Sequence, residues 1–151
     1  MSSAGVHVFP VRVYYEDTDA AGIVYYANYL HYAERARTEL LRDLGIENAQ
    51  LMEDQNLAFA VRRCSMDFVK PAKLDDMLAV ETRLTGIGGA SLTADQRVRR
   101  DEADLVLMEM KLACMDVNGR PARLPADVRS RFEAFGVAEQ TNDNHSIETT
   151  D

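Results

Sequence analysis

The fold is decided by residues 11–29, VRVYYEDTDAAGIVYYANY, where one hydrophobic pattern gives way to another. At its start, apolar Val11 and Val13 alternate with polar neighbours, which is the period of a half-buried strand. We therefore expect a first strand over about residues 6–16. After a polar turn that contains Gly22, apolar residues recur at the three- and four-residue spacing of an amphipathic helix.

This helix is expected to run for about five turns and to end at Gly45, a typical C-terminal stop. The charged residues Glu34 and Arg37 have the spacing of an ion pair on one helix face, and we expect that face to be exposed. The apolar positions that define the buried face are Leu30, Ala33, Leu40, Leu41 and Leu44.

Alternating apolar residues predict four further strands, at about 57–68, 78–84, 92–98 and 106–114. The alternation changes parity near Arg62 and Arg63, which indicates a β-bulge there. A short amphipathic helix is expected at Val128, Phe132 and Phe135. One long helix among strands that follow one another predicts an α+β fold, in which an antiparallel sheet of about five strands wraps around the helix.

Length and composition fit one globular domain, since 46% of the 151 residues are apolar and 28% are charged. Much of the net charge of −8 lies at the C-terminal end, because residues 136–151 hold four acids and no Lys or Arg. That stretch lacks apolar periodicity. We therefore expect a domain over residues 1–135 and an acidic, disordered tail over 136–151.

Several classes of function are excluded by what the sequence lacks. It has no Trp, no basic groove and no stacking motif, so nucleic acid is not an expected partner. No apolar run is long enough for a transmembrane segment or a signal peptide. Cys64 and Cys114 have no second ligand at metal-binding spacing. We expect a cytoplasmic protein with two reduced thiols and without a metal or cofactor.

Residues 16–29, EDTDAAGIVYYANY, are the candidate segment for chemistry, because no other catalytic pattern is present. The three histidines are scattered, and no G-x-S-x-G occurs. A calcium loop that starts at Asp17 is excluded, since Asn28 stands where a bidentate Glu is needed. Carboxylates before a helix can attack an activated carbonyl or take a proton from water, and unpaired helix N–H groups can hold an oxyanion. The same acids also suit caps and turns, and the three tyrosines also suit core packing.

At these residues the sequence resembles the hotdog-fold thioesterases of the 4-hydroxybenzoyl-CoA thioesterase family. It is most similar to the branch associated with the Tol-Pal cell-envelope system. The resemblance covers roughly residues 9–135. The stretches that carry it are residues 11–29, AERARTELL at 33–41, Val61-Arg62-Arg63, PAKLDD at 71–76 and PARLP at 121–125.

This resemblance implies a hotdog fold, assembled as dimers and commonly tetramers, and the hydrolysis of an acyl-CoA thioester. The family's catalytic carboxylate falls on Asp19, as a nucleophile that forms a mixed anhydride or as a general base on water. Its oxyanion donor falls on the backbone N–H of Tyr26. Gly22 and Tyr25, beside these two residues, are expected to contact the substrate.

The acyl and CoA sites are less sharply defined by the resemblance. Tol-Pal branch members carry His at the position of Tyr26, whereas the hydroxybenzoyl-CoA enzyme carries Tyr, so aliphatic and aryl acyl groups both remain open. Phe59 and Val61 are candidates for a pocket wall that a second subunit supplies. Arg63 is a candidate for binding substrate. Its basic neighbours that could also meet the CoA phosphates are Arg62, Lys70 and Lys73.

Two functions of different classes follow. The first is an acyl-CoA thioesterase that uses Asp19. The second is a low-activity binding or scaffold protein that keeps the fold and serves an acyl carrier protein or the cell-envelope machinery. A hotdog dehydratase is less favoured, because its His and Glu pair has no counterpart near the helix.

Overall fold

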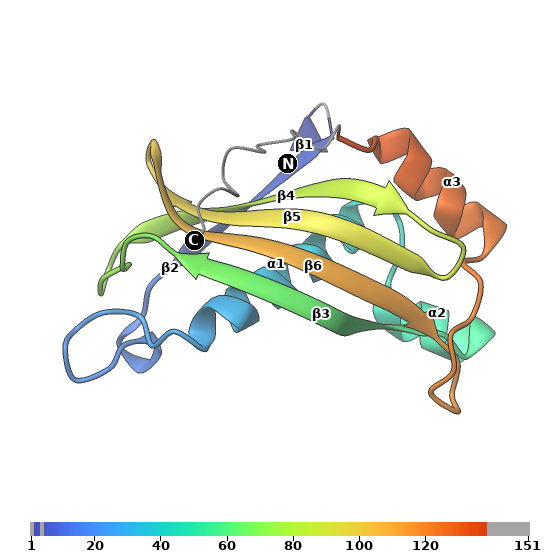
Figure 1. The fold of residues 1–151 in the computed structure, drawn as a ribbon, viewed down its shortest axis with the longest axis horizontal. Coiled ribbons are helices and arrows are strands. Elements are labelled where there is room, and N and C mark those ends of the chain that lie inside the picture. Colours follow the sequence, from blue (N-terminus) through green and yellow to red (C-terminus); the bar gives the residue numbers. More distant parts are fainter. Residues whose placement is uncertain (1, 4, 139–151) are drawn as a thin grey trace, which may run out of the picture.

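The computed structural model describes residues 2–3 and 5–138, and its centre is an antiparallel sheet (Figure 1). The order across the sheet is β1-β2-β4-β5-β6-β3. Five strands are long, as predicted, while β1 adds two residues at one edge. The strands are β1 (Ser2–Ser3), β2 (Val6–Arg12), β3 (Ala58–Phe68), β4 (Met77–Ile87), β5 (Ser91–Arg100) and β6 (Ala103–Met115).

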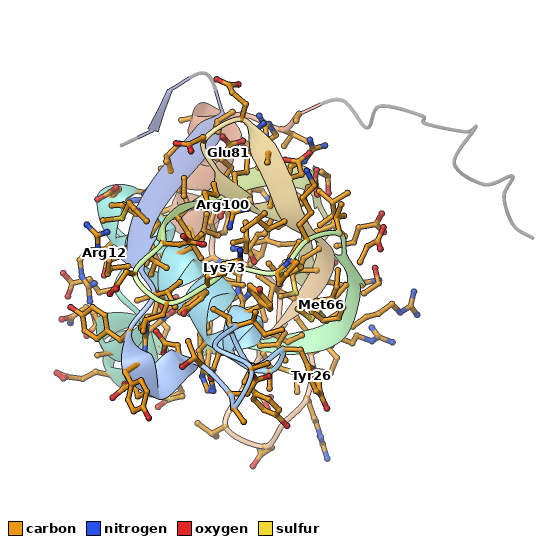
Figure 2. All side chains as sticks on the ribbon, turned by 90° about the vertical axis from the view of Figure 1, so that its left-hand side faces the viewer. Arg12, Tyr26, Met66, Lys73, Glu81 and Arg100 are labelled. Atoms are coloured by element: carbon orange, nitrogen blue, oxygen red, sulfur yellow. The ribbon has the colours of Figure 1, made fainter. Side chains whose placement is uncertain are left out.

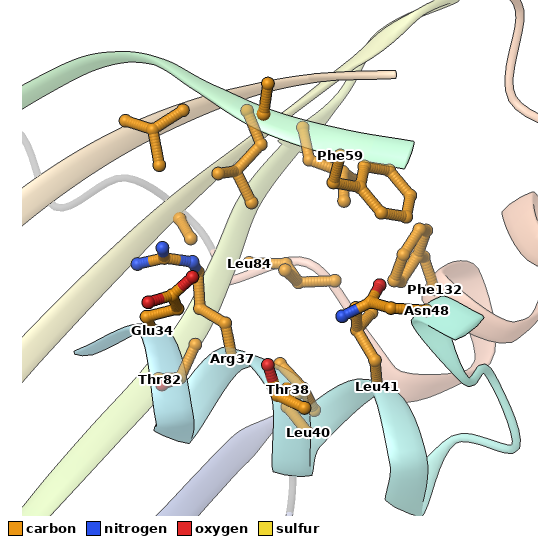
Figure 3. A pocket seen from close by; sticks show the side chains of 15 residues that line it. Glu34, Arg37, Thr38, Leu40, Leu41, Asn48, Phe59, Thr82, Leu84 and Phe132 are labelled. Carbon is orange, nitrogen blue, oxygen red and sulfur yellow. The ribbon is translucent and has the colours of Figure 1, made fainter. Parts of the chain in front are cut away.

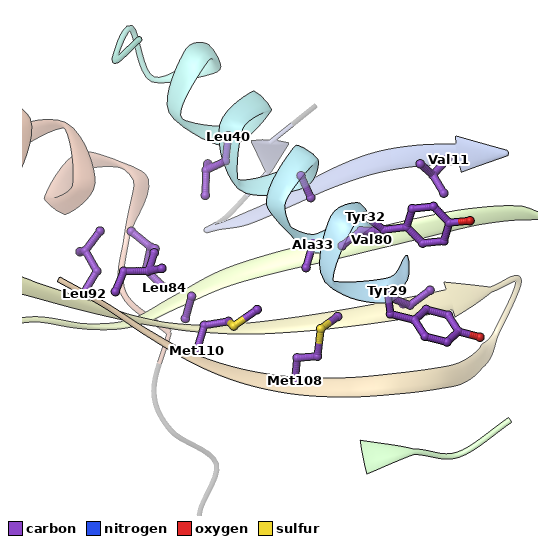
Figure 4. Packing of buried hydrophobic residues seen from close by; sticks show 14 of the residues in the cluster. Val11, Tyr29, Tyr32, Ala33, Leu40, Val80, Leu84, Leu92, Met108 and Met110 are labelled. Atoms are coloured by element: carbon purple, nitrogen blue, oxygen red, sulfur yellow. The ribbon is translucent and has the colours of Figure 1, made fainter. Parts of the chain in front are cut away.

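The long helix α1 (Asn28–Asp43) lies across one face of the sheet and packs on β2 and β4. Its buried residues are Tyr29, Tyr32, Ala33, Ala36 and Leu40. Figure 4 shows Tyr29, Tyr32, Ala33 and Leu40 against apolar side chains of the sheet, among them Val80, Leu84, Met108 and Met110. Each fully buried large apolar side chain in such an interface contributes about 1.5–3 kcal/mol. The predicted α+β architecture, a sheet around one helix, is confirmed.

Gly45 ends α1, as its position in the sequence predicts. Its φ of +82° is in the left-handed region that favours glycine. The Gly45 N–H donates to the Arg42 carbonyl at 3.0 Å, and the Ile46 N–H donates to the Leu41 carbonyl at 2.8 Å. These two bonds form a Schellman cap, which satisfies carbonyls that the helix end would otherwise leave unpaired.

The edge strand β3 pairs with β6 along one side and contains the predicted bulge, because its register shifts between Val61 and Arg63. Among the described strands, its other side has no partner. Large apolar side chains remain open along it, with Val61 47% and Phe68 49% exposed. An edge of this length and composition is a surface on which another strand can pair.

β2 ends at Arg12, four residues before the predicted end at Glu16. The reason is local: the Asp17 carboxylate accepts a hydrogen bond from the Tyr14 N–H at 2.8 Å and closes the short 3₁₀ turn η1 (Tyr15–Asp17). An Asp side chain that bonds nearby backbone competes in this way with strand pairing.

Two shorter helices lie at the same end of the sheet (Figure 1). The predicted α3 (Ala126–Phe135) is present, and its residues Val128 and Phe132 are buried. The other helix, α2 (Asn48–Gln55), is not predicted by the sequence pattern, because Leu51 is its one buried residue.

The predicted tail starts at Gly136, and its residues 139–151 lie outside the described part of the chain. Residues 136–138 run beside β4, where the Ala138 N–H donates to the Leu84 carbonyl at 2.8 Å. Cys64 and Cys114 are free thiols, as expected. Within the described ranges, every helix is too short or too polar to cross a membrane.

Candidate active site

Residues 17–25, here called the junction loop, connect η1 to the start of α1. Thr18 and Val24 form an antiparallel bridge, and the Asp19 N–H donates to the Ile23 carbonyl at 2.9 Å. Gly22 closes the turn with φ +78°. The exposed Asp19 carboxylate lies at this turn, where its Oδ1 accepts the Ala21 N–H at 2.9 Å. Asp19 therefore stabilises the turn, as considered from the sequence, but it does so through one carboxylate oxygen.

The start of α1 is bound directly to the junction loop. The Asp17 carbonyl accepts both the Tyr25 N–H and the Asn28 side-chain N–H, each at 2.9 Å. The N-cap residue of α1 is Ala27, and neither Asp17 nor Asp19 caps the helix. Among the described residues, the N–H groups of Tyr26 and Ala27 have no acceptor. Such unpaired N–H groups, at the positive end of a 16-residue helix, can stabilise an anion.

A second segment, residues 70–76, supports the junction loop from the side. The Val24 N–H donates to the Ala72 carbonyl at 2.9 Å, and Ile23 forms a bridge with Lys73. This segment is itself held by an ion pair of 2.7 Å between Arg100 and Asp76. Figure 2, which views this end of the molecule, shows Lys73 beside Arg100. The exposed Lys73 is thus the candidate phosphate-binding residue that adjoins the junction loop.

We expect the stability of Asp76→Asn to depend less on pH in the acidic range than that of wild type. Burial alone raises the pKa of Asp76, but the Lys73 N–H and the Arg100 guanidinium outweigh it and hold the pKa below its usual value. Such a carboxyl contributes stability that is complete above its unfolded pKa of about 3.9 and is lost as pH falls through the folded pKa. The Tm of the variant should therefore be lower than that of wild type near pH 6, and the difference should shrink below about pH 4. Thermal unfolding followed by circular dichroism measures this, and a constant difference down to pH 2 would contradict it.

The three tyrosines of the motif have different environments. Tyr29 is 3% exposed and its hydroxyl accepts the Ala72 N–H at 3.0 Å, so it belongs to the core. Tyr25 and Tyr26 are 46% and 62% exposed, with ring centroids 4.8 Å apart. The Tyr26 ring also lies 6.2 Å from that of Phe68 on β3. Core packing therefore explains Tyr29 and leaves the other two rings available at the surface.

A cavity of about 260 Å³ lies between the C-terminal half of α1 and the sheet (Figure 3). Phe59 and Val61, which the sequence suggests for a wall that a second subunit supplies, line this cavity of their own chain. Asp19 and Tyr26 of the same chain do not. Most of its surface is apolar, and the other apolar lining residues are Leu40, Leu41, Ala60, Leu84, Leu92, Ala94, Leu112 and Phe132.

Arg37 faces this cavity, and its prediction as part of an exposed ion pair is wrong. Its Nη1 donates to Gln96 Oε1 at 2.9 Å. The fully buried Gln96 is fixed in turn, because its Nε2 donates to the Ala33 carbonyl and to Thr82 Oγ1, both at 3.0 Å. Burial lowers the pKa of Arg37. A buried polar group needs a hydrogen-bond partner. Because Gln96 is such a partner, Arg37 can occupy an inward position of the helix.

The remaining predicted site residues are spread over two places. Gly22 and Tyr25 lie with Asp19 in the junction loop. Arg63 is exposed beside the bulge of β3 and does not line the cavity. In the described part of the chain, no three His, Cys, Asp or Glu side chains converge as a metal site would require.

Comparison of the sequence with known proteins identifies the family of this chain. The model of the thioesterase-like superfamily matches residues 13–132. The acyl-CoA thioesterase YbgC of Haemophilus influenzae is 47% identical over 125 residues, which are 82% of this chain and 92% of that protein. The acyl-CoA thioester hydrolase YbgC of Escherichia coli O6:H1 is 42% identical over 127 residues, or 83% and 94% of the two chains.

A solved structure agrees with these relatives. The crystal structure of a probable thioesterase from Bartonella henselae superposes with a TM-score of 0.77 at 39% identity, covering 80% of this chain and 99% of that one. The chain therefore belongs to the thioesterase-like superfamily, and the hotdog fold and thioester hydrolase class expected from residues 11–29 are confirmed.

Proposed function

We propose that the chain hydrolyses acyl-CoA thioesters, with Asp19 as the catalytic carboxylate and the Tyr26 N–H as the oxyanion donor. One observation carries the proposal: the junction loop carries an exposed carboxylate, and its hydrogen bonds hold a helix start with two unpaired N–H groups. The names of the YbgC relatives support an acyl-CoA substrate.

The chemistry needs few groups because a thiolate is a good leaving group. In one route, an Asp19 oxygen attacks the thioester carbonyl and the oxyanion bonds to the Tyr26 N–H. The CoA thiolate then leaves, and water hydrolyses the resulting mixed anhydride, which restores Asp19. In the other route, Asp19 takes a proton from the water that attacks the carbonyl. Both routes yield the free acid and CoA without a cofactor.

The cavity beside α1 is the proposed acyl site, since its largely apolar wall suits a hydrocarbon group. Phe59 and Val61 contact the acyl group in this arrangement. Gly22 and Tyr25 lie at the thioester, while Arg63 and Lys73 are candidates for the phosphates of CoA.

We expect Ala94→Leu to shift the preference toward smaller acyl groups. Ala94 is 4% exposed and lines the cavity, so a larger side chain takes up space that the acyl group needs. One methylene in an apolar pocket changes kcat/KM by about 10- to 200-fold. The measurement is kcat/KM across a series of acyl chain lengths. Ala79→Leu, on the outer face of β4, is the matched control, and an equal shift in both variants would contradict this acyl site.

A second copy of the chain is the proposed partner. The junction loop and the cavity are separate within one chain, and the open edge of β3 carries exposed Val61 and Phe68. Pairing of two β3 edges would cover these side chains and bring Phe59 and Val61 of each chain to the other. Light scattering should give the mass of two or four chains. The free thiols Cys64 and Cys114 suit the reducing cytoplasm, where we place the enzyme.

The experiment that tests the function is the release of CoA thiol from a panel of aliphatic and aryl acyl-CoA thioesters. Turnover of at least one thioester supports the proposal. Negligible turnover of the whole panel would overturn it. If Asp19→Asn then still captured an acyl carrier protein or cell-envelope (Tol-Pal) proteins, the scaffold function would replace it.

A further inference from the structure

Asn28 joins the first turn of α1 to the junction loop through its side chain. Its Nδ2 donates to the Asp17 carbonyl at 2.9 Å, across 11 residues of sequence. The Tyr25 N–H donates to the same carbonyl at 2.9 Å. A carbonyl oxygen has two lone pairs, so both are used. One residue, Thr18, separates Asp17 from Asp19 along the chain, and Tyr25 lies directly before Tyr26.

The contact between the Asn28 side chain and the Asp17 carbonyl indicates a role other than helix stability, because helix stability does not require an Asn at this position. Asn is a weak helix former, and an acid at the same position would interact better with the helix dipole. The α1 N-terminus has no side-chain cap, and the Asn28 amide is turned back to the loop instead. Meanwhile the N–H groups of Tyr26 and Ala27 have no acceptor among the described residues. The contact thus holds the helix start in place while it leaves the two donors open.

We propose that Asn28 is a positioning residue, which fixes the Tyr26 N–H relative to the Asp19 carboxylate through the Asp17 carbonyl. This inference rests on the proposed function. The Tyr25 N–H bond fixes the end of the loop, and the Asn28 N–H donates to the Tyr25 carbonyl at 2.8 Å. The Asn28 side chain adds a direct bond from the first turn of α1 to the Asp17 carbonyl, which holds the residues between them in one orientation. Oxyanion stabilisation depends on donors that are already aligned when charge develops.

Asn28→Asp tests the proposal directly, because it replaces a donor by an acceptor of the same shape. The new carboxylate repels the Asp17 carbonyl, but it interacts favourably with the N-terminus of α1. We expect kcat to fall about 10- to 100-fold, KM to change less than about threefold, and Tm to stay within a few degrees of wild type. Asn28→Ala should show the same split between kcat and KM with a smaller fall in kcat, since it removes the donor without adding repulsion.

The matched control is Gln50→Glu, an amide-to-acid change on α2, where the side chain bonds to Asp54 at the surface. It should leave kcat unchanged. Wild-type kcat in Asn28→Asp, or falls in kcat and Tm that parallel each other in both Asn28 variants, would overturn the positioning role.

A second measurement does not depend on turnover. In ¹⁵N NMR spectra, the Tyr26 amide resonance should shift in Asn28→Asp and stay in place in Gln50→Glu. An unshifted Tyr26 amide would overturn the inference even if the protein is an active thioesterase. A shifted amide in a protein without thioesterase activity would keep the positioning contact and reject the proposed function.

Discussion

Asp19→Asn is expected to lower kcat by about 100- to 10,000-fold, the range that a positioned acid or base supplies. The substitution changes little else. The Asp19 carboxylate holds the turn through one oxygen, which accepts the Ala21 N–H, and an amide oxygen can accept the same bond. The variant therefore keeps the junction loop but loses the charge and basicity that either catalytic route needs. Release of CoA thiol, measured with the best thioester of the panel, gives kcat for both proteins.

Glu16→Gln is the matched control for this loss, because it removes a neighbouring exposed carboxylate that has no part in the proposed mechanism. Its kcat should stay within about twofold of wild type, as for most surface substitutions. Equal turnover by wild type and Asp19→Asn would remove Asp19 from the mechanism. A comparable loss in Glu16→Gln would show that the net charge near the loop, rather than one carboxylate, controls the rate.

The regular part of the fold can be predicted from the sequence because its hydrophobic period survives folding. α1 buries one continuous stripe, and β4 and β5 alternate between the core and the outer face. Even the bulge at Val61 and Arg63 is visible in the sequence, since one extra residue changes which positions are apolar. Helix α2 has no such period, because it contacts the core through Leu51 alone. Its one signal is Asn56, which ends the helix with φ +58°.

Arg37 shows why the inner polar contacts could not be predicted. Hydrophobic periodicity treats a charged residue on a helix as exposed, whereas this guanidinium faces a cavity and bonds to a glutamine on β5. Gln96 itself stands in an apolar alternation, and its inward position is predictable. The pairing of Arg37 with Gln96 could not be predicted, because residues 59 positions apart meet only through the packing of the whole domain.

The candidate site also has a part that the sequence predicts and a part that it does not. A motif that is continuous in sequence brought Asp19, Gly22, Tyr25 and Tyr26 into one hypothesis, and the structure places them in one loop and the helix start that follows it. Phe59 and Val61 come together with α1 in a cavity that is remote from that loop within one chain. The role of Asn28 could not be predicted, since it depends on a carbonyl whose direction is set by η1 and the junction loop.

The largest effect expected at the helix start is that of Tyr26→Pro, which removes the proposed oxyanion donor. Loss of one such donor lowers kcat about 100- to 1,000-fold in other enzymes. Proline is tolerated near the first turn of a helix, and the Tyr26 N–H makes no bond with the described residues that the fold would lose. Tyr26→Phe keeps the N–H and should lower kcat by less than about threefold, since it removes one exposed hydroxyl. The measurement is kcat for both variants with the same thioester.

Ala27→Pro decides which of the two unpaired N–H groups carries the negative charge. Its φ of −68° already matches that of proline, so the substitution removes the second N–H at little conformational cost at residue 27 itself. If Tyr26 is the donor, kcat should fall less than about tenfold in Ala27→Pro and at least tenfold further in Tyr26→Pro. The reverse order would move the oxyanion site one residue into the helix start. A loss in Tyr26→Phe as large as that in Tyr26→Pro would assign the effect to the hydroxyl, and the backbone would then have no special role.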